Sequence, residues 1–452
     1  MRRIAFLLLA AVSLLSVAAG ETRPRYGGTL RVMLQAPLNS LELSTNGTPS
    51  DYWDSVRVQA MLADNLVSID VAGRPQPELA LAWQSDANGR RWSFTVRQGV
   101  KFDDGNVASA AVIAQILGER HPEWTVRGAG DSLTVESDSP LASLLAELAL
   151  PRNAIVKRNS SGLPIGTGAL RVADFQPGKF VKLIANEDSW AGRPFVDVVE
   201  IELGRSLRDQ DIALDLSKAD LIEAIPQSPA LNSGSQRVRT SLSVELMALA
   251  FPANSKAQDA RLREALALVI DRKPIQSVLL KGAAEPTASI LPNWMTGYSA
   301  VFSTQANVQR AKAVLADSRQ PTLTLSYDPR DPQAQLIAER IALNAREAGI
   351  TLQVSLSGVA DVNLTRIVLP SADPATSLRE AARALGLQQP LIQGNSLDDL
   401  YSAERGMLDL HTVIPLIHLP VASAAGGRVR HWQPGRAGDW SLSDVRLEAD
   451  SR

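Results

Sequence analysis

Hydrophobic and polar residues alternate from Arg91 to Arg97, where Trp92, Phe94 and Val96 occupy every second position. A period of two predicts a strand with one buried face. The preceding segment, Ser85 to Gly89, is rich in turn-forming residues and ends in Asn-Gly, which is a strong hairpin signal. We therefore expect a β-hairpin here, followed by an alanine-rich helix opened by Asp103 or Asp104.

A second pattern, with a period near 3.6, lies in the middle of the chain. Leu262, Ala265, Leu266, Val269 and Ile270 fall at i, i+3, i+4, i+7 and i+8. This spacing puts five apolar side chains on one face of a helix. The aspartate at position 259 is expected to cap that helix, and the proline at 274 to start the next one.

Similar patterns run through the rest of the chain and predict a mixed α/β protein. Helices are expected at 55–66, 109–117, 308–315, 331–348 and 375–385. Strands are expected at 66–71, 133–136, 180–185, 198–203, 244–251, 323–327, 352–354 and 413–418. Residues 227–239 are rich in Ser, Gly, Asn and Pro without periodicity, which predicts a linker. Gly166 and Gly168 are expected to allow a bend with positive φ.

Composition narrows the function classes. The 452 residues are 45% hydrophobic and 21% charged, with a formal net charge of −2. These values describe an ordinary globular protein of two or three domains, with no reason to expect a nucleic-acid partner. Cysteine is absent, which excludes disulfides, thiolate nucleophiles and Cys-based zinc sites. It also excludes the lipidated cysteine of a bacterial lipoprotein anchor.

The N-terminal residues resemble a secretory signal peptide. Arg2 and Arg3 precede an apolar run from Ile4 to Val17, and small residues follow up to Gly20. This arrangement predicts cleavage near residue 20 and export. An uncleaved membrane anchor is the alternative, although the run is short for a membrane span.

The four histidines are His121, His411, His418 and His431. None of them forms a His-x-x-x-His or Glu-x-x-His pair, so structural or surface roles are expected and no metal site is predicted. A nickel ion carried by its own ligands remains an alternative, because such a complex needs few protein ligands.

The stretch from Pro77 to Gly105 closely resembles the signature of the family 5 extracellular solute-binding proteins, which bind oligopeptides, dipeptides or nickel for ABC importers. The matching positions, in the family order and spacing, are Pro77, Glu78, Leu79, Ala80, Trp83, Asn88, Gly89, Trp92, Phe94, Val96, Arg97, Gly99, Val100, Lys101, Phe102, Asp104 and Gly105. Further similar segments extend the resemblance from Gly27 to about Trp432.

The resemblance implies a two-lobed α/β periplasmic binding protein with a hinge and an interlobe cleft. Residues 1–20 would be the signal peptide, and 21–50, 160–241 and 420–452 the core of lobe I. Residues 51–159 would form an accessory subdomain of lobe I, and 242–419 would form lobe II. Lobe II is expected to be shorter than in the family.

The implied function is binding of a small solute, most simply a short peptide, by a periplasmic monomer without a lipid anchor or cofactor. The implied partner is an ABC permease in the inner membrane. Segments that line the family's cleft place Leu38, Asn39, Trp294, Ser371, Ala372 and Asp373 at the ligand. By resemblance Asp373 would meet the ligand's α-ammonium. It is equally placed to cap the helix expected at 375–385.

Two alternatives belong to other classes. Gly130-Asp131-Ser132-Leu133 resembles the nucleophile block of a lipase and esterase family. A secreted hydrolase would need Ser132 activated by a histidine, and Asp409-Leu410-His411 is one residue shorter than the usual Asp-x-x-His. The shortened second lobe suggests another alternative, a sensory or scaffolding relic of the binding-protein fold.

Overall fold

The computed structural model describes residues 26–43, 47–225, 237–315, 321–331, 333–356, 360–392, 396–435 and 437–448. The expected signal peptide and residues 227–236 of the expected linker lie outside these ranges. Within them, no helix combines the length and the apolar character needed to cross a membrane.

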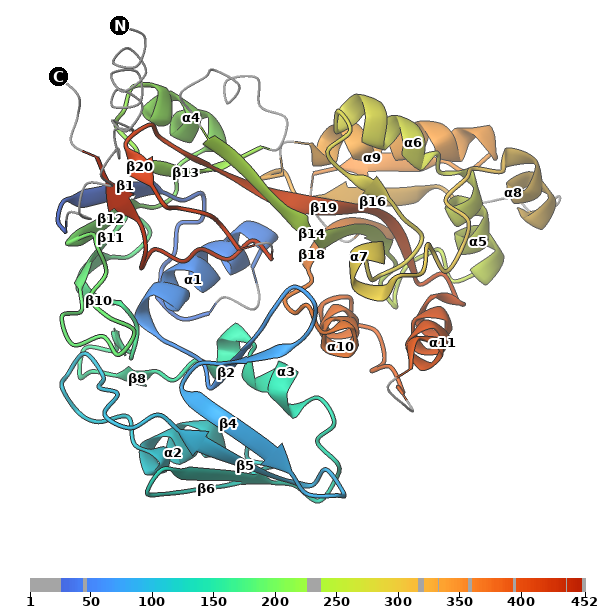
Figure 1. Ribbon diagram of the computed structural model, residues 1–452. Coiled ribbons are helices and arrows are strands. Elements are labelled where there is room, and N and C mark those ends of the chain that lie inside the picture. The colour runs from blue at the N-terminus through green and yellow to red at the C-terminus, as the bar shows by residue number, and fades with distance from the viewer. Residues whose placement is uncertain are drawn as a thin grey trace, which may run out of the picture.

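The described residues form a mixed α/β protein built on one eleven-stranded sheet (Figure 1). Ten of its strands follow in the order β10 (Leu170–Gln176), β11 (Phe180–Ala185), β12 (Val198–Glu202), β1 (Thr29–Met33), β13 (Leu221–Ala224), β19 (Val413–Ala425), β14 (Arg237–Ala250), β18 (Val362–Val368), β16 (Leu323–Tyr327) and β17 (Leu352–Ser355). Strand β1 runs parallel to β12 and β13, and β16 runs parallel to β17 and β18. The eleventh, β15 (Glu285–Pro286), pairs with β19.

The antiparallel strands β14 and β19 join the two halves of this sheet and run across the middle of Figure 1. Both are longer than the sequence predicts. Pro415 and Pro420 lie inside β19, and the register with β14 shifts beside each of them. Proline has no N–H to donate to the neighbouring strand, so the strand pairing becomes irregular at each proline. These irregularities interrupt the hydrophobic pattern, and the sequence therefore underestimates the length of both strands.

The first half of the sheet forms one core with α1 (Pro49–Leu62), and α4 (Leu207–Asp215) contacts β13. We call this half, with the chain after β19, the first region. Helix α1 begins six residues earlier than expected. A capping box between Thr48 and Asp51, with Pro49 in the first turn, fixes that start.

A separate four-stranded sheet, the small-sheet region, has its own core. It contains β4 (Ala80–Ser85), β5 (Arg91–Val96), β6 (Thr125–Ala129), β7 (Ser132–Glu136), α2 (Ala110–Arg120) and α3 (Leu144–Leu148). The expected hairpin is confirmed as β4 and β5, with Gly89 at φ 64° in its turn. The expected cap at Asp103 or Asp104 is wrong. The hydroxyl of Ser109 caps α2 instead. Lys101 and Val107 pair as an isolated β-bridge, so the chain is still extended at residue 107 and the helix begins after it.

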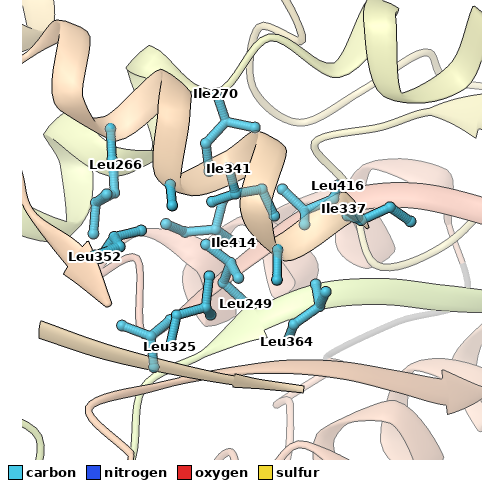
Figure 2. Close-up of a cluster of buried hydrophobic side chains, with 14 of the residues drawn as sticks. Leu249, Leu266, Ile270, Leu325, Ile337, Ile341, Leu352, Leu364, Ile414 and Leu416 are labelled. Carbon is cyan, nitrogen blue, oxygen red and sulfur yellow. The ribbon is translucent and has the colours of Figure 1, made fainter. Parts of the chain in front are cut away.

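The other half of the large sheet, the second region, has a core on each face. On one face, α5 (Ala260–Val269) and α9 (Ala334–Glu347) pack against β14, β16, β17, β18 and β19, and Figure 2 shows Ile337 and Ile341 of α9 among the leucines of the sheet. On the other face lie α10 (Pro374–Ala384) and α11 (Leu397–Leu408). Asp259 caps α5 as expected.

Short elements complete the described chain. They are β2 (Val67–Ile69), β3 (Pro75–Pro77), η1 (Pro151–Asn153), β8 (Lys157–Arg158), β9 (Pro164–Ile165), α6 (Arg272–Pro274), η3 (Ile275–Leu279), α7 (Asn293–Thr296), α8 (Val308–Leu315), β20 (Val429–Arg430) and β21 (Arg446–Leu447).

The expected positive φ at Gly166 and Gly168 is wrong. Neither glycine has one. Instead the segment passes against the end of α1, where a Cβ on Gly166 would lie 1.8 Å from the carbonyl oxygen of Leu62. These positions therefore require glycine for close backbone approach.

Candidate functional site

A cavity of about 630 Å³ lies between the first and second regions. Its position follows from the sheet topology. Strands β1, β12 and β13 are parallel, and the residues at or just after their carboxyl ends line the cavity, as is typical of ligand sites in open α/β sheets. The lining from the first region comprises residues 35–37, 47–51, 53, 57, 204–207 and 223–225.

The second region contributes the opposite wall, and the connecting strands contribute the rest. The second-region lining comprises 328, 330, 331, 333, 334 and 364–366, and the lining from β14 and β19 comprises 245, 247 and 419–422. The cavity thus touches both halves of the large sheet and both strands that join them.

Charged residues form three clusters around this cavity. In the first, which we call the floor cluster, Arg57 of α1 donates from Nη1 to Asp54 Oδ1 at 2.8 Å and to Glu223 Oε1 at 2.7 Å. The carboxylates in turn accept the backbone N–H groups of Gln35 and Ala36 at 2.6 and 2.8 Å. The floor cluster therefore fixes the loop after β1 that lines the cavity.

All three side chains of the floor cluster are buried. Burial and then the charge of Glu223 hold the pKa of Asp54 well above its usual range. Trp440 covers the guanidinium of Arg57, with Cζ 4.5 Å from the ring centroid.

The second, or strand cluster, joins Glu245 of β14, Arg366 of β18 and Asp331. Arg366 donates from Nε to Glu245 Oε2 at 2.6 Å and from Nη1 to Asp331 Oδ2 at 3.4 Å. Burial raises the pKa of Glu245. Trp53 of α1 donates to Glu245 Oε1 at 2.7 Å, so this cluster also connects the two regions.

The third, or rim cluster, is the most exposed. Arg330 donates to Asp51 Oδ2 at 3.4 Å and to Asp328 Oδ1 at 3.3 Å. Asp51 belongs to α1 in the first region, whereas Asp328 follows β16 in the second. The rim cluster therefore makes a second polar contact across the cavity.

Outside the cavity, α10 of the second region contacts the small-sheet region. Arg152 forms two hydrogen bonds with Glu380, at 2.8 and 3.1 Å, and Arg379 donates to Ser143 Oγ at 3.0 Å. Paired guanidinium–carboxylate bonds of this kind are directional as well as strong. They hold α10 in one orientation against the small-sheet region.

The six residues expected from the sequence do not line this cavity. Leu38 is buried in the first-region core, and Asn39 is exposed beside a second cavity of about 1060 Å³ next to the small-sheet region. Trp294 Nε1 donates to the carbonyl of Ser243 at 2.8 Å. Residues 36 and 37 of the same loop do line the cavity.

Asp373 is the N-cap of α10, where its Oδ1 accepts the Thr376 N–H at 2.8 Å. Ser371 Oγ accepts the Asp373 N–H at 3.1 Å, and the buried Ala372 presents its carbonyl to Gly73. The observed contacts of these three residues are local, and their ligand contacts stay a prediction.

Sequence reasoning missed the charged clusters. One signal was available, because Glu223 interrupts the short apolar strand β13 and Glu245 interrupts the apolar run 244–251. Carboxylates are almost never fully buried without a partner, so a glutamate inside a buried strand predicts a cation brought to it by the fold. The sequence alone does not identify Arg57 and Arg366 as those cations.

The histidines and Ser132 were the other candidates for chemistry. His418 Nε2 donates to the Ile290 carbonyl at 2.9 Å, and His121 contacts Glu123 and Asn153. Ser132 is exposed in β7, and no described hydrogen bond joins it to a histidine. In the part of the chain that the structure describes, no three His, Asp or Glu side chains are grouped as metal ligands would be.

Comparison with known proteins identifies the family to which this chain belongs. Residues 74–367, more than half of the chain, match the family described as bacterial extracellular solute-binding proteins, family 5 Middle. The nickel-binding protein NikA of Staphylococcus aureus is 23% identical over 72% of this chain and 70% of its own. The peptide transport periplasmic protein SapA of Salmonella typhimurium is 25% identical over 65% of this chain and 64% of its own.

Solved structures share the fold. The crystal structure of S. aureus NikA in complex with Ni(L-His)2 matches 93% of this chain and 100% of its own, with a TM-score of 0.79 at 17% identity. A dipeptide-binding protein from a Pseudoalteromonas species, in complex with Met-Leu, matches with the same values. The chain therefore belongs to the family 5 extracellular solute-binding proteins, the non-enzymatic solute-binding components of ABC transporters.

Proposed function

We propose that this protein binds a short peptide in the cavity between its two regions and delivers it to an ABC permease. The observation that carries the proposal is a cavity of about 630 Å³ that touches both regions and is lined by both carboxylate and guanidinium side chains. A peptide offers complementary groups, since it has two charged ends and a hydrogen-bonding backbone. The relatives named for peptide transport support this class of ligand.

In this proposal the two regions are lobes, with 21–50, 160–241 and 420–452 as the core of lobe I, 51–159 as its accessory subdomain and 242–419 as lobe II. Strands β14 and β19 then form the hinge, because they are the connections that cross beside the cavity. A ligand that contacts both walls stabilises the closed form. The shortening of lobe II relative to the family stays a prediction.

The cell location and partners follow from the same proposal. After cleavage of the signal peptide, the protein acts in the periplasm as a monomer without a lipid anchor. The closed, loaded form is the one that the permease in the inner membrane recognises.

A nickel complex is the second candidate, because NikA matches this chain in both sequence and fold. In that case the metal would arrive with its own ligands, and the charged clusters would hold those ligands rather than the ion.

Thermal unfolding distinguishes the two candidates. A pool of two- to five-residue peptides is expected to raise the melting temperature, since a ligand that binds only the folded state stabilises it by about 2.7 kcal/mol at a hundredfold excess over Kd. A pool of matched sugars is the negative control. No shift with peptides, together with a clear shift with Ni(II) and two equivalents of L-histidine, would replace the peptide with the nickel complex.

Two variants assign the binding to the cavity. Arg330→Gln removes the guanidinium of the rim cluster, which contacts Asp51 and Asp328, and is expected to change the peptide-induced shift. Arg310→Gln is the matched control, because Arg310 is equally exposed but lies on α8, away from the cavity lining. Equal shifts in both variants would place the peptide elsewhere.

A further inference from the structure

The three charged clusters around the cavity have the same ratio of guanidinium groups to carboxylates. In each cluster a single guanidinium group contacts two carboxylates, so six carboxylates surround three guanidinium groups, and with every carboxylate ionised the formal charge is −3. Arg205, the remaining charged residue of the lining, pairs with Glu202 at 2.8 Å and adds no net charge. Residues 44–46 and 226–236, which adjoin lining segments in the sequence, contain no charged side chain.

The excess negative charge is distributed over both walls. The floor cluster belongs to the first region, the strand cluster to the second, and the rim cluster spans the two. Solvent screens these charges only partly, because the carboxylates of the floor and strand clusters are at most 13% exposed. A cleft lined by an excess of one sign focuses its field on the space between the walls.

Two of the buried carboxylates bind a proton more tightly than exposed carboxylates do. Burial, together with Glu223, raises the pKa of Asp54, and burial raises that of Glu245. A proton retained by Asp54 reduces the formal charge of the three clusters from −3 to −2, which is still an excess of carboxylates over guanidinium groups.

We propose that the cavity selects ligands with a net positive charge, and that its peptide ligands carry a lysine or arginine side chain in addition to the terminal ammonium. This inference rests on the proposed function and narrows it. A basic side chain supplies the positive charge that the three clusters lack, whereas an acidic side chain adds to their excess.

Three tripeptides that differ in one side chain test the inference: Ala-Lys-Ala, Ala-Gln-Ala and Ala-Glu-Ala. By titration calorimetry at about 20 mM salt, the lysine peptide is expected to bind about tenfold more tightly than the glutamine peptide and about a hundredfold more tightly than the glutamate peptide. The differences are expected to narrow at about 300 mM salt, where the screening length is shorter.

A pair of variants locates the source of the preference. Asp328→Asn removes one carboxylate charge from the rim cluster and is expected to reduce the lysine-over-glutamate preference about tenfold. Asp188→Asn removes one charge from the exposed pair with Lys101, outside the cavity lining, and is expected to leave the preference unchanged. Both variants change the net charge of the protein equally.

The outcomes separate this inference from the proposed function. Binding of all three peptides with equal affinity overturns the charge preference and leaves peptide binding in place. Binding of none overturns both. A preference that falls equally in Asp328→Asn and Asp188→Asn overturns the assignment to the cavity, because it would follow the charge of the whole protein.

Discussion

The buried imidazole of His418 gives a sharp prediction about stability. His418 lies in β19, one of the two strands that join the regions, and is 2% exposed. Its Nε2 donates to the Ile290 carbonyl at 2.9 Å, which requires a proton on that nitrogen. Burial lowers the pKa of His418 from 6.5 to about 4, so the folded protein holds the neutral ring.

The sign and size of the effect follow from proton linkage. Between pH 6.5 and 4 the unfolded chain binds a proton at His418 that the folded protein does not, so stability is lost as the pH falls through this range. One pKa unit corresponds to 1.36 kcal/mol. The loss contributed by His418 is therefore roughly 3 kcal/mol in full and about 2 kcal/mol at pH 5.

Urea unfolding of the wild type and of His418→Gln at pH 7.5 and 5.0 measures this contribution. The glutamine amide can donate to the same carbonyl but does not titrate. The difference in unfolding free energy between the two proteins is expected to shift by about 2 kcal/mol against the wild type at pH 5.0.

Other titrating groups contribute equally to the stability of the wild type and of His418→Gln, so their effects cancel in the difference. Burial raises the pKa of Glu78 to about 7 and that of Asp103 to about 6, which favours the folded state as the pH falls, but both proteins contain them. His431→Gln, which removes an exposed imidazole, is the matched control. A difference between wild type and His418→Gln that stays constant within about 0.5 kcal/mol would refute the buried neutral imidazole.

Three further predictions concern backbone approach, Asp373 and export. Gly166→Ala should destabilise the fold by at least about 2 kcal/mol in urea unfolding, because its Cβ would clash with the Leu62 carbonyl; an unchanged midpoint would contradict the close approach. Asp373→Asn should keep the stability within about 0.5 kcal/mol, since asparagine also caps helices. Calorimetry then decides the ligand role: a loss of about thirtyfold for free but not N-acetylated peptides would indicate an ammonium contact, and equal affinities would leave capping alone. Exported protein should have the intact mass of a chain beginning near residue 20 or 21; a full-length mass would contradict cleavage.

Local elements could be predicted where their signals lie within a few residues. The hairpin of β4 and β5 depends on alternation and an Asn-Gly turn, and α5 depends on an apolar face and the cap at Asp259. The predicted starts of two helices were wrong because another local interaction determined where each helix begins. The capping box at Thr48 moved the start of α1, and Ser109 rather than Asp103 opened α2.

The sequence by itself determined the family, the α/β class and most of the strands and helices, because these depend on short-range patterns and on a long matching stretch. Only the tertiary structure decided the charged clusters around the cavity. Arg57 and Glu223 are 166 residues apart, and Arg366 and Glu245 are 121 apart. Arg57 meets Glu223 because α1 packs in the same core as β13, and Arg366 meets Glu245 because β18 pairs with β14. Both arrangements depend on long-range packing and strand pairing, which no local pattern encodes.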